Sequence, residues 1–397
     1  MTEKTKERGH GSLAGLGICI VIGFLFDLLL TNIHGSNAAL DYTNFVSGIT
    51  QSVPREIAWL FMNFTEPYFY ANVFAGIGII VGGFIAYALA MKNSRYAGFD
   101  ICYGSSSLFP WVVGSELLSA GLAIFVYRYI DLFNVEGTTW VATFITIAGA
   151  PPAVMLMYGP SLSAFLTVSI LGGLIACPTA TFFSQYLIGP WELPGVIANV
   201  LAMTVTGFIL CMIMKLCPFV RKAPIVDHRK GLPAKKEDVH STKWFIRRVI
   251  ADFSEAPFYG NEIASIGMLV GLVIGCCVCG THTAYGAGPA AVGAIVLSQF
   301  VSSAVGVFLY ADKFDNGEWY ATYVPVVSVG PACVLMFGST VPVALFAGIL
   351  GGIMGGPVAE FFGTRLPEGV HGTVANVTSM AVCTAIVAVT MKYLPCF

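Results

Sequence analysis

Apolar stretches of about 20 residues, separated by short polar connections, recur along the whole chain. A transmembrane α-helix needs about 20 predominantly apolar residues, so each stretch predicts one membrane-spanning helix. The pattern therefore predicts an all-α polytopic membrane protein with about eleven transmembrane helices. The expected helices lie at residues 12–33, 71–91, 106–127, 138–158, 160–187, 194–217, 262–281, 286–310, 319–337, 339–362 and 370–393.

The same sequence motifs occur twice, in the same order. Glu66-Pro-Tyr-Phe-Tyr-Ala-Asn72 returns as Glu255-Ala-Pro-Phe-Tyr-Gly-Asn261, and further motifs follow in both copies, among them Ala198-Asn-Val200 and Ala375-Asn-Val377. Self-similarity of this kind indicates that each copy is one structural unit. We therefore interpret the chain as two homologous five-helix repeats behind one additional N-terminal helix.

This duplication divides the chain into four parts. They are a segment with a cytoplasmic tail, one transmembrane helix and an external loop (1–65), repeat 1 (66–218), a basic cytoplasmic linker (219–254) and repeat 2 (255–397). Each repeat contains five expected spans, an odd number, and both repeats adjoin the same linker. The repeats therefore cross the membrane in opposite senses, as inverted repeats. An even number of spans would make them parallel, and Pro and Gly residues in 138–187 leave that count open.

Composition supports the membrane assignment and excludes other classes. Hydrophobic residues make up 56% of the 397 residues and charged residues only 11%, whereas soluble domains carry about 25% charged residues. The formal net charge of −2 argues against a nucleic-acid-binding protein, which needs a basic surface. The lipid bilayer and a small-molecule solute are the expected partners, and a homodimer stays open.

The few charged residues are unevenly distributed. Residues 1–10 and 218–255 hold 19 of the 42 charged side chains, and many of these are Lys or Arg. Because basic loops of membrane proteins face the cytoplasm, we expect the N-terminal tail and the linker on that side. Lys92 and Arg95 place their loop on the cytoplasmic side as well, whereas the equivalent loop 280–288 of the second repeat has no Lys or Arg and is expected to face outside. We thus expect a multi-pass protein of the plasma (cell inner) membrane with a cytoplasmic N-terminus.

Gly and Pro occur at equivalent positions inside one expected span of each repeat. The residues expected to break these helices are Gly172, Gly173 and Pro178, and Gly351, Gly352 and Pro357. Proline frees a backbone carbonyl one turn before it, and at membrane depth such a carbonyl can coordinate a cation. The hydroxyls near these breaks are further candidate ligands, namely those of Ser161, Thr179, Thr181 and Thr340. Close helix packing is the alternative, and we adopt it for the matched pairs Gly78/Gly82 and Gly267/Gly271.

Two asparagines, Asn199 and Asn376, occupy equivalent positions within apolar segments. A buried amide needs hydrogen-bond partners, and leaving one unpaired costs about 1–3 kcal/mol. A substrate or a sodium ion is one candidate partner, and a neighbouring helix is the other. The segment around Asn376 is unusually polar and adds His371, Thr378 and Ser379 to the candidate binding residues.

Ionisable residues within apolar spans are rare and mark functional sites. Glu116 lies in such a span, and its equivalent in repeat 2 is Gln299. An acid in one repeat that faces an amide in the other suits a single proton or cation site. Glu360 follows the second Gly-Gly pair and is another candidate. A structural ion pair or an interfacial position is the alternative for both acids.

A thiol-based metal site is the weaker possibility. Cys276, Cys279 and His282 have a spacing that suits Zn or Cu(I). The surrounding span is apolar and the first repeat has no such residues, while cysteine is also a common small packing residue. We therefore expect no bound metal or other cofactor, apart from Na⁺ or H⁺ as the coupling ion.

These features favour an ion-coupled secondary transporter. Inverted repeats can expose a site at their interface to each side of the membrane in turn, which is alternating access. A small polar, anionic solute is the expected cargo, with Na⁺ symport preferred and H⁺ coupling through Glu116 or Glu360 as the variant. A channel or facilitator, or a metal-ion transporter using the cysteine cluster, is the alternative. No Walker, H-E-x-x-H or G-x-S-x-G motif occurs, so we expect no enzymatic activity.

Overall fold

In the computed structural model, the described part of the chain comprises residues 9–33, 35, 41–102, 106–226, 238–279, 284–315 and 319–397. This part consists of helices and loops without a β-strand, in agreement with the predicted all-α class. Nine of its helices are long and apolar enough to cross a membrane, as predicted for a helical membrane protein. They are α1 (Leu13–Asn32), α4 (Val73–Met91), α5 (Phe109–Gly121, continued by a π-helical turn to Val126), α7 (Leu162–Phe183), α8 (Val196–Leu216), α10 (Glu262–Cys279), α11 (Pro289–Leu309), α14 (Val341–Gly363) and α15 (Thr373–Tyr393).

Two of the eleven expected spans, 138–158 and 319–337, are not single helices. The first contains the 3-10 helix η6 (Thr143–Thr146) and then α6 (Ala150–Tyr158), and the second contains η9 (Val324–Val327) and then α13 (Val329–Phe337). With nine residues each, α6 and α13 are too short to span a bilayer, which takes about 20 residues. The remaining short helices are α2 (Tyr42–Val46), η2 (Ile49–Gln51), α3 (Val53–Met62), η3 (Glu66–Tyr68), η5 (Tyr129–Asn134), η7 (Ser184–Ile188), η8 (Gly189–Trp191), α9 (Thr242–Asp252) and α12 (Ala311–Phe314).

Helices α7 and α14 continue through the residues expected to break them, so the expected breaks are wrong. The residues inside these helices are Gly172, Gly173 and Pro178 in α7, and Gly351, Gly352 and Pro357 in α14. Each proline frees the carbonyl four residues before it. Tyr129 donates its hydroxyl to the Leu174 oxygen at 2.6 Å, and Tyr310 donates to the Ile353 oxygen. Tyrosine hydroxyls therefore take the place of the missing N–H groups, and the helices stay intact.

The glycines of α7 and α14 allow neighbouring segments to approach closely. A Cβ at Gly172 would lie 2.7 Å from the Pro151 ring of α6, and a Cβ at Gly173 would lie 2.7 Å from the Ser119 carbonyl oxygen of α5. The glycine pair of α14 packs in the same way against η9 and α11. These glycines thus serve helix packing, which was the alternative interpretation of the Gly-Gly pairs.

Helices α4 and α10 cross at the glycines whose spacing predicts tight packing. A Cβ at Gly78 would clash with the Gly267 carbonyl oxygen, and a Cβ at Gly267 would clash with the Gly78 carbonyl oxygen. One turn further along α4, Gly82 faces Ile263, which lies one turn earlier in α10. Residue numbers rise along one helix as they fall along the other, so α4 and α10 run antiparallel.

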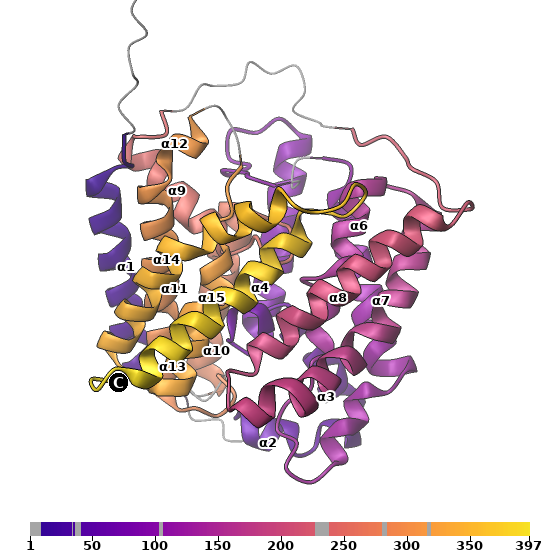
Figure 1. Cartoon of the computed structure of the whole chain (residues 1–397), viewed down its shortest axis with the longest axis horizontal. Helices are drawn as coiled ribbons and strands as arrows, with labels where there is room; N and C mark the ends of the chain where they lie inside the picture. The colour runs from indigo at the N-terminus through magenta and orange to yellow at the C-terminus, as the bar shows by residue number, and fades with distance from the viewer. Residues whose placement is uncertain are drawn as a thin grey trace, which may run out of the picture.

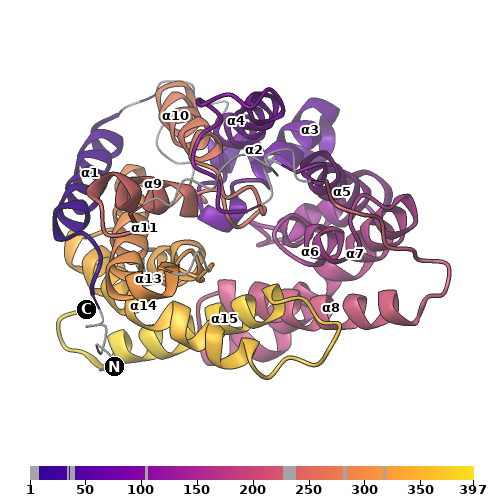
Figure 2. The same cartoon turned by 90° about the horizontal axis from the view of Figure 1, so that it is seen from above.

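Helices α8 and α15 also lie side by side and run antiparallel (Figures 1 and 2). The hydroxyl oxygens of Thr204 and Thr378 are 3.3 Å apart. Gly207, three residues further along α8, faces Val374, which lies four residues earlier in α15. Two pairs of helices from equivalent parts of the chain therefore cross in opposite directions.

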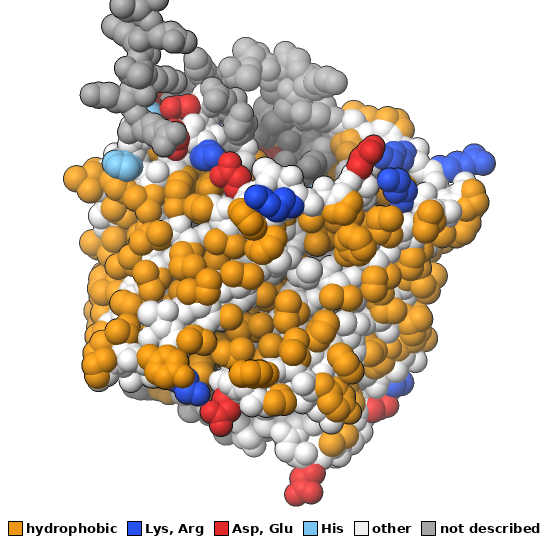
Figure 3. All heavy atoms as spheres, viewed as in Figure 1, with side chains coloured by type: hydrophobic (Ala, Val, Ile, Leu, Met, Phe, Trp, Pro, Cys, Tyr) orange, Lys and Arg blue, Asp and Glu red, His pale blue; other side chains and the backbone are white. Residues whose placement is uncertain are grey.

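These two helix pairs lie between two clusters of helices. Seen from above, α1, α11, α13 and α14 gather on one side and α5, α6 and α7 on the other (Figure 2). The α4–α10 pair and the α8–α15 pair lie on opposite edges between the clusters. On the face drawn in Figure 3, apolar side chains form a broad band and charged side chains gather above and below it. This distribution suits a molecule surrounded by lipid.

Part of the region that was expected to be a basic cytoplasmic linker is packed inside the protein. Residues 227–237 lie outside the described residues, whereas residues 242–252 form α9. Arg248 of α9 is only 1% exposed and forms an ion pair with the buried Asp252. Ser303 of α11 donates a hydrogen bond to Asp252 at 2.5 Å. The end of the linker is therefore a structural element, because its charges are paired within the protein.

Candidate functional site

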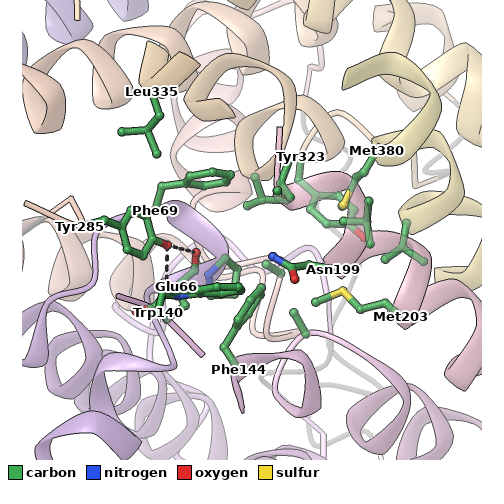
Figure 4. Close-up of a pocket in the computed structure, with 18 residues that line it drawn as sticks. Glu66, Phe69, Trp140, Phe144, Asn199, Met203, Tyr285, Tyr323, Leu335 and Met380 are labelled. Atoms are coloured by element: carbon green, nitrogen blue, oxygen red, sulfur yellow. Dashed lines mark hydrogen bonds between the residues drawn. The ribbon is translucent and has the colours of Figure 1, made fainter. Parts of the chain in front are cut away.

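A cavity of about 190 Å³ lies between the first half of the chain (66–218) and the second half (255–397), and we call it the Glu66 cavity. Its walls come from η3, η6 and α8 of the first half and from η9, α13 and α15 of the second. Figure 4 shows that aromatic and sulfur-containing side chains surround it. The labelled members of this set are Phe69, Trp140, Phe144, Met203, Tyr285, Tyr323 and Met380.

Glu66 is the only acidic residue that lines this cavity within the described part of the chain. Its side chain is 1% exposed, and its Oε2 accepts hydrogen bonds from Trp140 Nε1 at 2.7 Å and from the Tyr285 hydroxyl at 2.8 Å (Figure 4). Its Oε1 has no hydrogen-bond partner among the residues that the structure describes. Burial raises the pKa of Glu66 to about 7, although the two hydrogen bonds lower it in part.

A sharp turn after Glu66 holds this carboxylate in place. Phe69, at the end of η3, adopts a left-handed conformation with φ of 66°. The Asn72 N–H then donates back to the Thr65 hydroxyl at 3.2 Å, and the Asn72 side chain caps α4 by accepting from the Ala75 N–H at 2.9 Å. The start of α4 and Glu66 are therefore fixed relative to one another.

Asn199, one of the two predicted asparagines, lies across the cavity from Glu66. It belongs to the first turn of α8, is 6% exposed and lines the cavity (Figure 4). None of the cavity-lining residues in the described segments is Lys, Arg or His. The cavity therefore offers one acid and one amide in apolar surroundings.

A second cavity of about 430 Å³, which we call the Glu255 cavity, contains the equivalent residues of the second half. Glu255 is 3% exposed and accepts a hydrogen bond from the Trp319 indole. Asn376 also lines this cavity and donates to the Tyr323 hydroxyl at 3.2 Å. Tyr323 lines both cavities and so lies at the boundary between them.

Other polar groups surround Glu255. Cys102 Sγ lies 3.9 Å from Glu255 Oε1, and Arg248 Nη2 lies 3.7 Å from Glu255 Oε2. Glu255 Oε2 has no hydrogen-bond partner in the described part of the chain. Burial raises the pKa of Glu255, and the nearby Arg248 charge lowers it in part. His371 lines the same cavity, and burial lowers its pKa to about 4, so the imidazole is neutral at pH 7.

The predicted pair Glu116 and Gln299 lies apart from both cavities. Each residue is fully buried and contacts a tyrosine of the other half of the chain. Tyr259 donates its hydroxyl to Glu116 at 2.8 Å, and Tyr70 donates to Gln299 at 2.5 Å. The two residues do not contact each other in a shared site. Their equivalent hydrogen bonds connect the two halves of the chain.

We expect Glu116→Gln to fold and transport like the wild type, with a change in stability below about 1 kcal/mol, because Gln299 accepts the same kind of tyrosine hydrogen bond. Glu116→Ala leaves the buried Tyr259 hydroxyl without its acceptor, which costs about 1–3 kcal/mol. Thermal unfolding of both variants in detergent, combined with an uptake assay, checks this expectation. Loss of transport in a stably folded Glu116→Gln protein would show that the acid itself is needed.

The predicted hydroxyl ligands do not line either cavity, and most of them bond to backbone groups. Ser161 and Thr340 cap the N-termini of α7 and α14, where each accepts a backbone N–H. Thr179, Thr181 and Thr378 each donate to the carbonyl four residues earlier in their own helix, and Ser379 donates to the Gly355 carbonyl. These hydroxyls satisfy helical backbone groups, which explains why they occur in apolar spans.

Glu360 lies at the protein surface and not in a buried site. Its side chain is 47% exposed and pairs with Lys313 at 2.7 Å. The Tyr320 hydroxyl also donates to it at 3.2 Å. The alternative of a structural ion pair therefore describes Glu360.

The predicted cysteine cluster lies only in part within the described residues, since His282 is outside them. Cys276 and Cys279 are buried in α10, while Cys277 is exposed. No group of three or more His, Cys, Asp or Glu side chains in the described segments is placed to hold a metal ion. The burial of Cys276 and Cys279 agrees with the alternative interpretation of cysteine as a small packing residue.

Sequence reasoning missed Glu66, Glu255 and their tryptophan partners as site residues. Both acids open the duplicated motif, but they lie just outside the apolar stretches and were used only to recognise the duplication. Trp140 and Trp319 were equally visible as an equivalent pair. A repeated acid together with a repeated tryptophan was the available signal, because buried carboxylates need donors.

No protein family, curated protein or solved structure matches this chain.

Proposed function

We propose that this protein is a secondary transporter that exchanges a small organic cation for a proton by alternating access at the Glu66 cavity. The observation that carries this proposal is a buried carboxylate with one unpartnered oxygen in an aromatic cavity. A charged carboxylate is costly in such surroundings unless a partner neutralises it. Glu66 therefore holds either a proton or a cationic solute, and the two compete for the same oxygen atoms.

The cavity walls favour an organic cation over the other candidate solutes. Aromatic rings such as Trp140, Phe144 and Tyr285 attract ammonium groups through their electron-rich faces. Glu66 would repel an anion, and no basic side chain of the cavity would compensate for this repulsion. The proposed cation therefore replaces the anionic cargo expected from the sequence. A sodium ion prefers several oxygen ligands, whereas Glu66 and Asn199 are the main polar side chains here.

We propose further that the two halves of the chain are inverted repeats. The antiparallel crossings of α4 with α10 and of α8 with α15 support this, since equivalent helices of parallel repeats would run in the same direction. Equivalent turns support the duplication itself, because Phe69 and Phe258 share a left-handed backbone and Asn72 and Asn261 follow them. Two such halves can rock about the cavity between them.

The distribution of basic residues supports a cytoplasmic position for the N-terminus and the linker. The end of the molecule at which α1 begins and α9 lies holds most of the described Lys and Arg side chains. We propose that this end faces the cytoplasm of a plasma membrane. The basic residues at this end are Lys92, Arg95, Lys215, Arg221, Lys222, Lys243, Arg247, Lys313 and Arg365. The opposite end carries Arg55, Arg128 and Lys392.

Cation–proton exchange can be measured in proteoliposomes that enclose a pH-sensitive dye and are acidic inside. External tetraethylammonium, choline or benzyltrimethylammonium is expected to raise the internal pH at least about tenfold faster than in protein-free liposomes, since exchange needs the carrier. These quaternary cations cannot cross the bilayer as neutral bases, which removes the usual leak. Preloading with unlabelled cation should also accelerate uptake of the labelled cation, which a channel would not show.

Two outcomes of this assay count against the proposal. Sodium-dependent uptake of benzoate or acetate, without any response to the quaternary cations, would restore the anion symporter. Cation flux that is fast and insensitive to preloading would indicate a channel.

A further inference from the structure

The Glu255 cavity has an incomplete set of hydrogen bonds around its acid. Glu255 accepts a hydrogen bond from Trp319 through Oε1, and its Oε2 is buried without a hydrogen-bond partner in the described segments. The cavity of about 430 Å³ lies beside this carboxylate. A buried carboxylate oxygen of this kind needs a donor or a cation, because desolvation without a partner is costly.

Arg248 does not fully neutralise this acid. Its guanidinium pairs with Asp252 and donates to the Tyr320 carbonyl at 3.0 Å, while its distance to Glu255 Oε2 is 3.7 Å. Asp252 balances the charge of Arg248, so an ionised Glu255 leaves one negative charge in the cluster. The neutral His371 imidazole adds no positive charge.

The walls of the Glu255 cavity resemble those of the Glu66 cavity in chemistry. Trp319, Tyr323 and Phe258 supply aromatic rings, and Asn376 supplies an amide. Lys and Arg are absent from the lining residues that the structure describes. An acid, aromatic rings and an amide form a set that attracts an ammonium group and repels an anion.

The acids of the two cavities lie on opposite sides of the crossing of α4 and α10. Glu66 precedes α4 by one short turn, and Glu255 precedes α10 in the same way. Because α4 and α10 run antiparallel, the two acids lie on opposite sides of the contact between Gly78 and Gly267. Cys102, in the loop after α4, reaches Glu255, and Tyr285, in the loop after α10, reaches Glu66.

We propose that the Glu255 cavity is a second binding site for a small organic cation, next to the Glu66 cavity and separated from it by Tyr323. The ligand class rests on the proposed function, whereas the site itself rests on the geometry around Glu255. One molecule of cation then binds in each cavity.

Binding stoichiometry tests this proposal directly. Titration calorimetry of the full chain in detergent at pH 8, with benzyltrimethylammonium as the probe, should give two equivalents for the wild type. Glu66→Gln and Glu255→Gln should each give one equivalent, and the double variant should give none. Glutamine keeps the side-chain size and can still accept the tryptophan hydrogen bond, so the cavity shape is preserved.

The outcomes separate this proposal from the proposed function. One equivalent in the wild type that is lost only in Glu66→Gln overturns the second site and leaves the transport proposal standing. One equivalent that is lost only in Glu255→Gln keeps the second site and overturns the role of Glu66. No binding in any of the proteins overturns both.

A measurement on the wild-type chain covers the case in which Glu255→Gln fails to fold. Cys102 lines the Glu255 cavity and is partly exposed, so its reaction with small thiol reagents, namely cationic 2-aminoethyl or anionic 2-sulfonatoethyl methanethiosulfonate, reports on the cavity. The ratio of cationic to anionic rates at Cys102 should exceed the ratio at the exposed Cys396 at least about tenfold, because a negative cavity concentrates cations. Mass spectrometry of the two peptides gives both ratios. Equal ratios would contradict a cation-binding cavity.

Discussion

Glu66→Gln is expected to lower the rate of cation–proton exchange at least about 30-fold, because losing one partner of a buried charge pair costs about 2–5 kcal/mol. Glutamine can neither release a proton nor carry the negative charge that binds the solute. It still accepts hydrogen bonds from Trp140 and Tyr285, so the cavity keeps its shape. The dye assay in proteoliposomes measures the rate, and calorimetry in detergent measures the affinity.

The pH dependence of binding gives this prediction a distinct signature. With the pKa of Glu66 near 7, a proton occupies the carboxylate below that pH and excludes the cation. Wild-type affinity should rise about tenfold per pH unit from pH 5 to 7 and level off above it, as expected for one competing proton. Glu66→Gln should lose this binding event together with its pH dependence, so that the one remaining equivalent belongs to the Glu255 cavity.

The stability of the ligand-free protein should fall as the pH rises, whereas the affinity for the cation rises. The folded protein holds the Glu66 proton up to about pH 7, whereas the unfolded chain releases it near its ordinary pKa of 4.5. The folded state therefore binds more protons between these values, and stability falls as the pH rises through this window. At pH 8, Glu66→Gln should exceed the wild type by at most about 3 kcal/mol, and the difference should vanish near pH 4.

Glu136→Gln is the matched control, since Glu136 is exposed in a loop and lines neither cavity. It should leave exchange, affinity and their pH dependence unchanged. If Glu66→Gln exchanged cations at the wild-type rate while folding normally, Glu66 could not be the exchange site.

The helical class and most of the spans were predictable because they depend on local properties. A run of about 20 apolar residues is sufficient to specify a membrane helix, whatever its neighbours are. Spans 138–158 and 319–337 failed this rule because prolines and their neighbours divide them into a 3-10 helix and a short α-helix. The glycine pairs of α4 and α10 were also predictable as packing faces, since their spacing places them on one side of each helix.

The candidate site was less predictable because it depends on tertiary contacts. Burial of Glu66 comes from Trp140 and Tyr285, which lie far away in the sequence, and no local pattern marks a buried acid in a turn. In the same way, the expectation of a break at Pro178 ignored Tyr129, whose hydroxyl satisfies the freed carbonyl. Asn199, predicted as a binding residue, lines the Glu66 cavity, and the signal was local because a polar side chain in an apolar helix needs a specific environment.

Gly78→Val and Gly267→Val are each expected to lower the stability of the protein by about 3 kcal/mol or more, which exceeds the usual cost of overpacking of about 1–3 kcal/mol. A side chain at either position meets the backbone of the opposite helix, which cannot move aside as a flexible side chain can. The α4–α10 pair would have to separate, and Glu66 and Glu255 would lose their fixed positions next to these helices. Both variants should therefore give little monodisperse protein in detergent and a clearly lower unfolding temperature.

Gly17→Val provides the control because Gly17 also lies in a membrane-spanning helix, and a Cβ there meets nothing within 4 Å. This variant should express and unfold like the wild type, since its added side chain faces open space or lipid. The reciprocal contact also requires that Gly78→Val and Gly267→Val have similar effects, because each carbonyl blocks the other helix. If both variants unfolded at the temperature of Gly17→Val, the close antiparallel crossing would be incorrect. The placement of the two acids on opposite sides of that crossing would then lose its support.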